Sequence, residues 1–236
     1  MARKPTRRPR SRAEPTGPEA TGAKSTRDRI IEAFMALLAE KPVQAIGFSE
    51  IARNAGVSLA ELRGEFGSTT AILAAYIKEI DRAVLHSEDA DMAEEPPRER
   101  LFDVLMRRIE ALAPHKEAVR SLARSAARNP GLAIALNSLA VRSQQWMLTA
   151  AGMSAAGPKG MMRAQALAML FASVLRTWLD DDDPGHARTM AALDSALARG
   201  QRWSSFLDDL FAIPERLCRA RPRRRRDDAG DETIAA

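Results

Sequence analysis

The chain has 236 residues, of which 45% are hydrophobic and only 5% aromatic, and its formal net charge is +5. This length allows one large domain, or a small domain followed by a medium-sized one, and the abundance of Ala, Leu and Arg favours helix over sheet. A single cysteine, Cys218, excludes an internal disulfide. No apolar run reaches the roughly 18 residues that a membrane span needs, and the basic N-terminus lacks the apolar segment of a secretory signal. We therefore expect a cytoplasmic protein without a membrane span.

The positive charge is concentrated at the two ends of the chain. Residues 1–24 carry a net charge of +5 and residues 214–236 carry +2, which leaves −2 for residues 25–213. Because residues 1–24 have almost no large apolar side chains, we expect a disordered basic tail there, and a disordered tail of mixed charge over 214–236. The N-terminal tail is either only solvated or an arm that contacts phosphates. The four arginines at 223–226 either solubilise the chain or touch nucleic acid or an anionic membrane surface.

The first helix is predicted to begin at Ser25, where Ser25 and Asp28 can cap it through a hydroxyl and a carboxylate. Apolar residues then recur at the spacing of one helix face. The residues of this face are Ile30, Ile31, Phe34, Leu37 and Leu38. Pro42 lies just after the helix end.

Two short helices follow. A helix over residues 48–55 would end at Gly56, because glycine accepts the left-handed conformation after a helix. Its predicted inward residues are Phe48, Ile51, Ala52 and Ala55. Ser58 and Glu61 then form a capping box that starts the next helix, which carries Leu62 inward and closes at Phe66-Gly67. Two short helices joined by a glycine-containing turn and braced by a longer first helix predict a helix-turn-helix.

The remaining chain reads as a series of longer helices. The next one runs from about Ser68 to Asp89, and its apolar stripe consists of Ile72, Leu73, Tyr76, Ile77, Ile80 and Val84. Further helices are expected at about 98–113, 115–128, 131–151, 159–180 and 186–211, separated by proline- and glycine-containing breaks. No strand-like alternation occurs. The fold class is therefore all-α, with about nine helices.

Residues 25–77 resemble the DNA-binding domain of the TetR family of transcriptional regulators. The segments that carry the resemblance are Ile30 to Ala33, Leu37-Leu38, Ile51-Ala52, Ala55 to Ser58, Leu62, Phe66 to Ser68 and Ile72-Leu73. The resemblance implies that the helix after Ser58 lies in the DNA major groove. It also implies that residues 78–213 form a helical ligand-binding and dimerisation domain, and that the last two long helices supply the dimer interface.

The resemblance points to a DNA-binding repressor that recognises a pseudo-palindromic operator as a homodimer and is released by a small apolar ligand. The residues implied to contact DNA are Gly47, Ser49, Val57, Ser58, Leu59, Ala60, Glu61, Arg63, Gly64 and Thr69. Three of them depart from the family pattern, which usually has a tyrosine at Arg63, a lysine at Thr69 and a Thr or Ser at Gly47. Residues 25–69 carry a net charge of −1, although phosphate contacts dominate affinity for nucleic acids. Arg63 could replace the tyrosine as a phosphate donor.

A second resemblance leaves an alternative open. The segments Trp178 to Asp181 and Thr189 to Asp194 are similar to the end of the ubiquinone-biosynthesis accessory proteins, which share the TetR fold but bind lipid. On that reading the helix-turn-helix is a relic. Both readings place an apolar ligand in the later helices, where methionine and aromatic residues suit either a cavity or the core. The candidate ligand residues are Met106, Trp146, Met147, Met169, Phe171 and Trp178.

No catalytic, metal or cofactor site is expected. His86, His115 and His186 are isolated and have no partner at metal-ligand spacing. The run from Asp180 to Asp183 is read as a solvated turn, with Asp183 capping a helix whose first residue is Pro184. There is no nucleophile elbow and no glycine-rich phosphate loop, so nothing favours an enzyme.

Overall fold

The computed structural model describes residues 24–87, 92 and 94–200. All regular elements within these residues are helical. They are α1 (Thr26–Glu40), η1 (Val43–Ala45), α2 (Phe48–Ala55), α3 (Leu59–Glu65), α4 (Thr69–His86), α5 (Pro97–Leu112), η3 (Ala113–His115), α6 (Lys116–Arg128), α7 (Pro130–Ala150), α8 (Gly157–Leu179) and a helix over 187–200. The expected all-helical class is confirmed. The tails at 1–23 and 214–236, and the expected continuation of the last helix to 211, lie outside the described residues.

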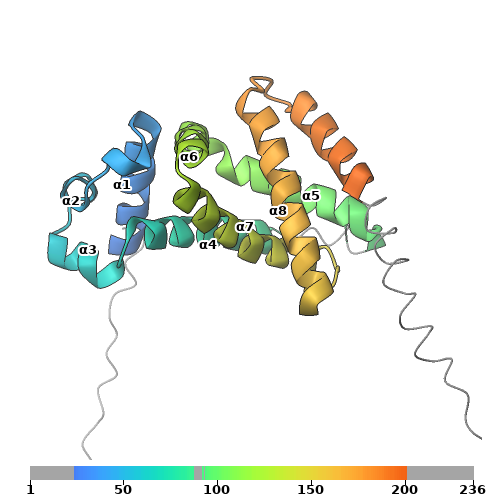
Figure 1. The fold of residues 1–236 in the computed structure, drawn as a ribbon, viewed down its shortest axis with the longest axis horizontal. Helices are drawn as coiled ribbons and strands as arrows, with labels where there is room; N and C mark the ends of the chain where they lie inside the picture. Colours follow the sequence, from blue (N-terminus) through green and yellow to red (C-terminus); the bar gives the residue numbers. More distant parts are fainter. Residues whose placement is uncertain (1–23, 88–91, 93, 201–236) are drawn as a thin grey trace, which may run out of the picture.

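Helices α1 to α3 gather at one end of the molecule, and we call them the head (Figure 1). Helix α1 packs against α2, α3 and α4. Its apolar stripe is buried as expected, with Ile30, Phe34 and Leu38 fully inaccessible to solvent. They pack in one core with Ile51 of α2 and Leu62 of α3. Burying such side chains stabilises the head by roughly 1.5–3 kcal/mol each.

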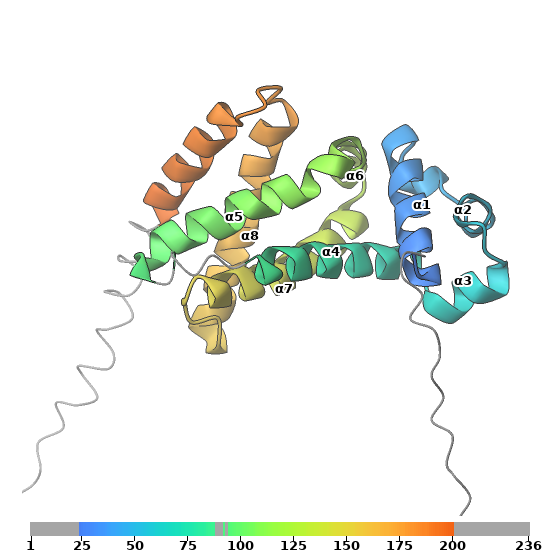
Figure 2. The same ribbon diagram turned by 180° about the vertical axis from the view of Figure 1, so that it is seen from behind.

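The longer helices form the body, and α4 leads from the head into it (Figure 1). Helix α4 packs on α1 in the head and on α5 and α7 in the body. Figure 2, seen from behind, shows α5 crossing in front of α8. Helix α7 packs lengthwise against α8, and α6 packs between α1 and α7. The body therefore contacts the head through two helices, α4 and α6.

Side-chain caps explain where several of these helices begin. The Ser68 hydroxyl accepts a hydrogen bond from Ala71 N at 3.1 Å at the start of α4, and Asn129 Oδ1 accepts one from Leu132 N at 3.1 Å at the start of α7. Pro130 is the first residue of α7, where its missing N–H has no helical partner to lose. The bounds expected from the sequence differ from the observed ones by at most three residues, because fraying ends are weakly specified.

Two expectations about individual residues were wrong. Phe48 is not inward, because its side chain is 44% exposed. It is the first residue of α2, and side chains tilt toward the N-terminus of their helix, so the ring projects past the packed turn. Likewise Pro184 does not start a helix. Pro184 and Gly185 form a turn, His186 has a left-handed φ of 52°, and the helix begins at residue 187.

The aspartate run before that helix is only partly solvated. Asp180, Asp182 and Asp183 are exposed, but Asp181 is 1% exposed. Asp183 does act as a cap, since its Oδ2 accepts a hydrogen bond from Ala187 N at 3.1 Å. The Asp181 carboxylate accepts bonds from Thr189 N and Thr189 Oγ1 at 2.9 and 2.6 Å. Asp181 is therefore a structural residue of this turn.

Candidate nucleic-acid interface

The turn between α2 and α3 depends on one glycine. Gly56 has φ +63° and ψ +39°, the left-handed conformation that costs glycine least. Its N–H donates to Arg53 O at 3.2 Å, and Val57 N donates to Ala52 O at 3.0 Å, which closes the carbonyl end of α2. The Gly56 carbonyl in turn accepts a hydrogen bond from Arg29 Nη1 at 3.3 Å. Helix α1 therefore holds the turn in place.

The start of α3 is fixed by the expected capping box. Ser58 Oγ accepts a hydrogen bond from Glu61 N at 3.1 Å, and Glu61 Oε2 accepts bonds from Ser58 N at 2.7 Å and from Ser58 Oγ at 2.8 Å. These hydrogen bonds from Ser58 hold the pKa of the Glu61 carboxyl below its ordinary value. Because Ser58 and Glu61 are tied to each other, Leu59 and Ala60 between them point to solvent, and Leu59 is 52% exposed.

Most of the candidate DNA-contacting residues are exposed on the head. Eight of the ten are exposed: Gly47, Ser49, Ser58, Leu59, Ala60, Glu61, Arg63 and Gly64. Val57 and Thr69 are half-buried, and Val57 packs against the core. The eight exposed residues come from the start of α2 and from α3 with its cap. These side chains are therefore accessible to a partner.

Most cations of the head are used within it. Arg27 forms an ion pair with Glu65 at 3.6 Å and lies over the Phe66 ring at 4.7 Å. Lys41 pairs with Glu50, and Lys24 pairs with Glu32. Arg29 is engaged with the Gly56 carbonyl. These contacts stabilise the head, but they reduce the number of cations that can meet a phosphate.

Arg53 and Arg63 are the exceptions. Both are exposed, and neither takes part in an ion pair among the residues described in the head. Arg63 Nη1 lies 3.4 Å from the position that a Cβ on Gly67 would take. The guanidinium therefore sits beside the turn that leads to the Ser68 cap of α4. A helix N-terminus and an adjacent guanidinium both favour an anion such as phosphate.

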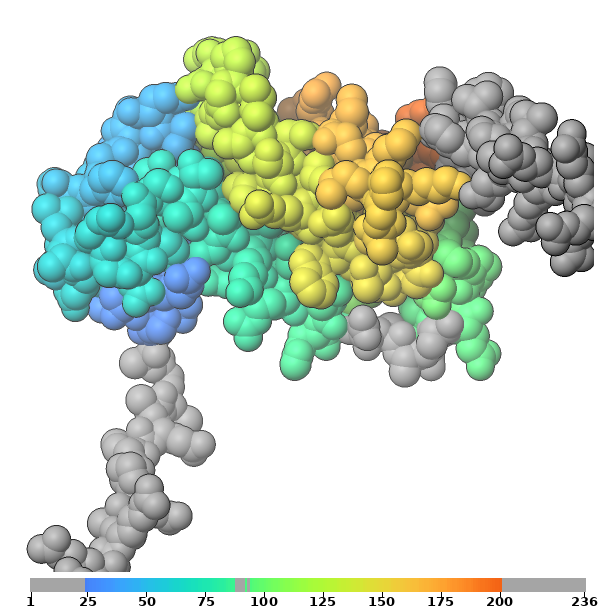
Figure 3. All heavy atoms as spheres, turned by 60° about the horizontal axis from the view of Figure 1, so that its bottom comes forward, coloured from blue at the N-terminus to red at the C-terminus, as the bar shows by residue number. Residues whose placement is uncertain are grey.

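The six candidate ligand residues do not all meet. Met147, Phe171 and Trp178 are buried in the body core, and Met106 is half-buried. Trp146 and Met169 are 59% and 67% exposed, on α7 and α8, whose surfaces lie side by side in Figure 3. A hollow of about 380 Å³ between α1 and the start of α6 is lined by none of the six. The sequence therefore grouped residues that the fold separates into core and surface.

A buried polar cluster was missed by the sequence analysis. Asp81 of α4 pairs with Arg108 of α5 and accepts a hydrogen bond from Ser143 Oγ of α7 at 2.7 Å. All three side chains are at most about one-tenth exposed, and the Arg108 guanidinium lies 5.6 Å from the centre of the Phe171 ring. One signal was available. Asp81 and Arg108 each interrupt the apolar stripe of their helix, which marks a charge facing the core.

Neither a metal site nor a membrane span was found where the structure describes the chain. No group of three or more His, Cys, Asp or Glu side chains is placed to hold a metal ion within residues 24–87, 92 and 94–200. Among the helices of that same part, none has the length and apolarity that crossing a bilayer requires.

No family model matches the sequence, and no curated protein matches it either. Solved structures do match. The TetR transcriptional regulator from Nitrosomonas europaea superposes with a TM-score of 0.59 at 22% identity, over 75% of this chain and 98% of that one. A TetR-family regulator from a Rhodococcus species gives a TM-score of 0.51 at 21% identity, over 73% and 98% of the two chains. Another, from Streptomyces coelicolor, gives 0.50 at 16% identity, over 83% and 92%. With the helix-turn-helix head and helical body described above, these matches show that the chain has the fold of the TetR-family transcriptional regulators.

Proposed function

We propose that this chain is a transcriptional repressor that binds a pseudo-palindromic operator in double-stranded DNA. The observation that carries the proposal is the head itself. The Gly56 turn and the Ser58–Glu61 capping box hold α3 rigidly, and the exposed side of α3 begins with Leu59 and Ala60. Such a surface suits the major groove, where small apolar side chains can contact thymine methyls. Arg53 and Arg63 supply the phosphate contacts, together with the basic segment 1–24.

A homodimer follows from the proposed operator. Two heads related by a two-fold axis match a palindromic site in symmetry. The last two helices of the described chain are the proposed interface, as the resemblance implies. In support, α8 exposes three methionines, Met161, Met162 and Met169, at 51%, 49% and 67%. Large apolar side chains gathered on one helix surface mark a contact with another protein surface.

A small ligand is proposed to release the operator by binding in the body. Helices α4, α5, α7 and α8 meet around Met147, Phe171 and the Asp81–Arg108 pair. Arg108 Nε and Gln144 Oε1 are buried without a hydrogen-bond partner among the described residues. These two atoms support a mainly apolar ligand that carries one hydrogen-bonding group. Ligand binding would favour one spacing of the two heads, because only differential affinity shifts an equilibrium.

The test is selection of genomic DNA fragments by the full-length protein at low salt. We expect an enriched sequence with two half-sites about one helical turn or a multiple apart. Gly56→Val is the matched variant, since it cannot adopt φ +63° without strain and should abolish enrichment. Arg124→Ala, at an exposed position of α6 outside the proposed dimer interface, is the control. Failure to enrich any sequence would refute the repressor.

The second candidate is a lipid-binding protein of ubiquinone-biosynthesis type, in which the head no longer reads DNA. It is favoured by the internal use of Arg27, Arg29 and Lys41 within a head that is slightly acidic overall. Native mass spectrometry of freshly purified protein separates the two. A stoichiometric quinone-like lipid with no enriched DNA would establish this candidate, whereas enriched palindromic DNA released by a small apolar compound would establish the repressor.

A further inference from the structure

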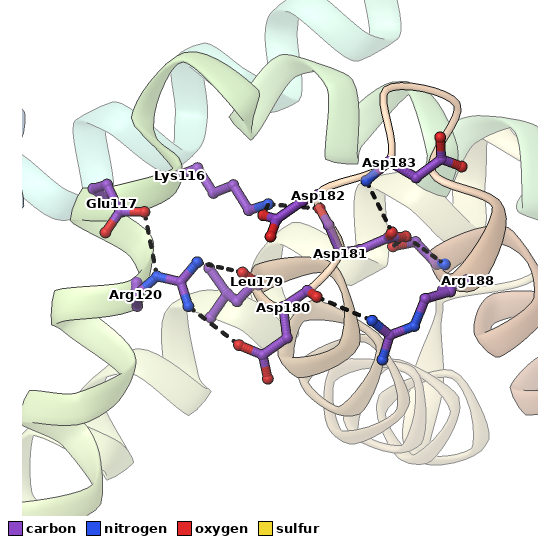
Figure 4. A network of polar contacts seen from close by, with 10 residues as sticks. Lys116, Glu117, Arg120, Leu179, Asp180, Asp181, Asp182, Asp183 and Arg188 are labelled. Atoms are coloured by element: carbon purple, nitrogen blue, oxygen red, sulfur yellow. Dashed lines mark hydrogen bonds and ion pairs between the residues drawn. The ribbon is translucent and has the colours of Figure 1, made fainter.

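Two cationic side chains from the start of α6 bind the carboxyl end of α8 (Figure 4). Arg120 donates to the Leu179 carbonyl and also pairs with Asp180 at 3.2 Å. Lys116 donates to the Asp181 carbonyl at 2.7 Å. We call these contacts the α6–α8 clamp.

Further contacts hold the two cations of the clamp in position. Arg120 Nε lies 3.3 Å from a Glu117 carboxylate oxygen, one turn earlier on α6. Lys116 Nζ lies 5.6 Å from the centre of the buried Trp178 ring and 3.8 Å from an Asp182 carboxylate oxygen. The side chains of Lys116 and Arg120 are only 23% and 28% exposed, so solvent screens them less than it screens an open surface pair. The last carbonyls of a helix carry partial negative charge and lack helical partners, so cations are well matched to this place.

The turn after α8, which the clamp contacts, is also hydrogen-bonded to the helix over 187–200. The buried Asp181 carboxylate binds both the N–H and the hydroxyl of Thr189. Arg188 Nη1 donates to the Asp180 carbonyl at 3.2 Å. The end of α8 and the start of the next helix therefore move as one unit, and the clamp holds that unit.

The other side of α6 faces the head. Helix α6 packs along α1. Ser121 Oγ also donates to the Lys41 carbonyl at 3.1 Å, immediately after the end of α1. Among the described residues, α6 packs far less against α8 than against α1. The polar clamp is therefore the main direct link between α6 and α8. Besides the indirect connection through α7, which packs on both helices, Lys116 and Arg120 thus join the α8 turn to α6, and α6 packs on α1.

We propose that Lys116 and Arg120 are positioning residues that couple the α8 turn to α1 of the head. The consequence for operator affinity rests on the proposed function, whereas the coupling itself does not. Charge-assisted hydrogen bonds are short and directional, so the clamp holds the α8 turn in a defined position relative to α6. It ties the orientation of each head to the helices proposed as the dimer interface.

Hydrogen exchange of the full-length protein without DNA tests the coupling. The test variant is Lys116→Met/Arg120→Met, which keeps the apolar stems, and the control is Arg124→Met at an exposed position of the same helix. We expect exchange in Thr26–Glu40 and in residues 179–189 to become about fivefold faster or more, since a free-energy change of one to two kcal/mol is a factor of this size. The control should leave both segments unchanged.

Acceleration confined to residues 113–121 and 179–189, with α1 unchanged, would overturn the coupling, as would no acceleration at all. If the double variant loosens the whole chain, Arg120→Met alone replaces it, because it removes the contacts of Arg120 with Leu179 and Asp180 and leaves Lys116 in place. Acceleration of exchange in α1 would again support the coupling, and unchanged exchange in α1 would again overturn it. Affinity for a selected operator is then measured for the same variant. If α1 loosens but no DNA sequence is ever enriched, the coupling stands and the repressor proposal fails.

Discussion

Arg63 shows how a single departure from a family pattern can be assessed in its structural setting. The sequence alone presented it as a lost tyrosine in a head of net negative charge. In the structure Arg63 is exposed beside the Gly67 turn, whereas Arg27 and Lys41 are paired with carboxylates. Several of the carboxylates that make the head acidic are thus partners in internal ion pairs. The cations that matter for a polyanion are the unpaired ones.

The first prediction concerns Arg63 and DNA. Arg63→Ala should weaken operator binding about tenfold and lower the slope of log affinity against log salt by about 1, because one phosphate contact is removed. Fluorescence anisotropy with a selected operator at several salt concentrations measures both quantities. Arg124→Ala, on the exposed side of α6, is the control and should change neither. An unchanged salt slope would mean that Arg63 does not contact phosphate.

The second prediction concerns the pH dependence of the α3 cap. The pKa of Glu61 is lowered by its hydrogen bonds to Ser58, so the charged form stabilises the folded state. This contribution is fully present above the ordinary Glu pKa and is lost as pH falls through the lowered folded-state pKa. Glu61→Gln should therefore lower the melting temperature at about pH 7 more than at about pH 3, where a larger share of the Glu61 carboxyl is protonated. Thermal unfolding followed by circular dichroism measures the difference, and an equal loss at both values would contradict the prediction.

At the scale of the elements, the polar cluster in the body joins three helices, and we expect it to favour one arrangement of them. Asp81, Arg108 and Ser143 come from α4, α5 and α7. An apolar core tolerates several registers of helix against helix, whereas a buried charge pair satisfies its hydrogen bonds in only a few arrangements. Since α4 also enters the head, this cluster helps to set the direction in which α4 leaves the body.

The third prediction is the cost of breaking that cluster. Arg108→Met should lower the free energy of unfolding by about 3–5 kcal/mol, because Asp81 is left buried and uncompensated. Ser143→Ala should cost only about 1–3 kcal/mol, the price of one missing partner. The double variant Asp81→Leu/Arg108→Met should regain much of the loss. Urea unfolding measures all three, and a double variant less stable than Arg108→Met would contradict a charge-based penalty.

The whole molecule combines a compact head with a body whose outer helices expose large apolar residues. Ile134 and Trp146 on α7 are 69% and 59% exposed, and Met169 on the adjacent α8 is 67% exposed. Asn137 and Gln165 form a reciprocal amide pair at 3.0 Å between the same two helices. Single exposed apolar residues are common, but several on adjoining helices favour a surface that another chain covers.

The fourth prediction is a homodimer whose interface includes the exposed apolar residues of α8. The full-length protein should scatter light as a particle near twice its 25.8 kDa mass at micromolar concentration. Met162→Asp/Met169→Asp should shift it toward the monomer, because two charges would have to be desolvated in the interface. Leu59→Asp, an equally exposed apolar position in the head, should leave the mass unchanged. A wild-type protein of monomeric mass would refute the dimer.

Much of this architecture could be predicted from the sequence because it depends on neighbours along the chain. The apolar stripe of α1, the left-handed Gly56 and the capping boxes at Ser25 and Ser58 involve residues within about one or two helical turns, and they were confirmed. The predicted inward orientation of Phe48 was wrong because the helical period does not fully determine whether a side chain is buried. Periodicity gives the direction of a side chain around a helix, but not how far along the helix the packing extends.

What only the tertiary structure decided are contacts between residues distant in the sequence. Arg108 meets Asp81 across 27 positions, and Arg120 meets Leu179 across 59. The helical pattern specifies that each helix has a buried face, yet it does not specify which helices share it or at what angle. The separation of Met147 and Trp178 in the core from Trp146 and Met169 on the surface has the same origin. Local hydrogen bonds and periodicity determined the helices, and the packing of those helices determined which charges were paired and which were left to meet a partner.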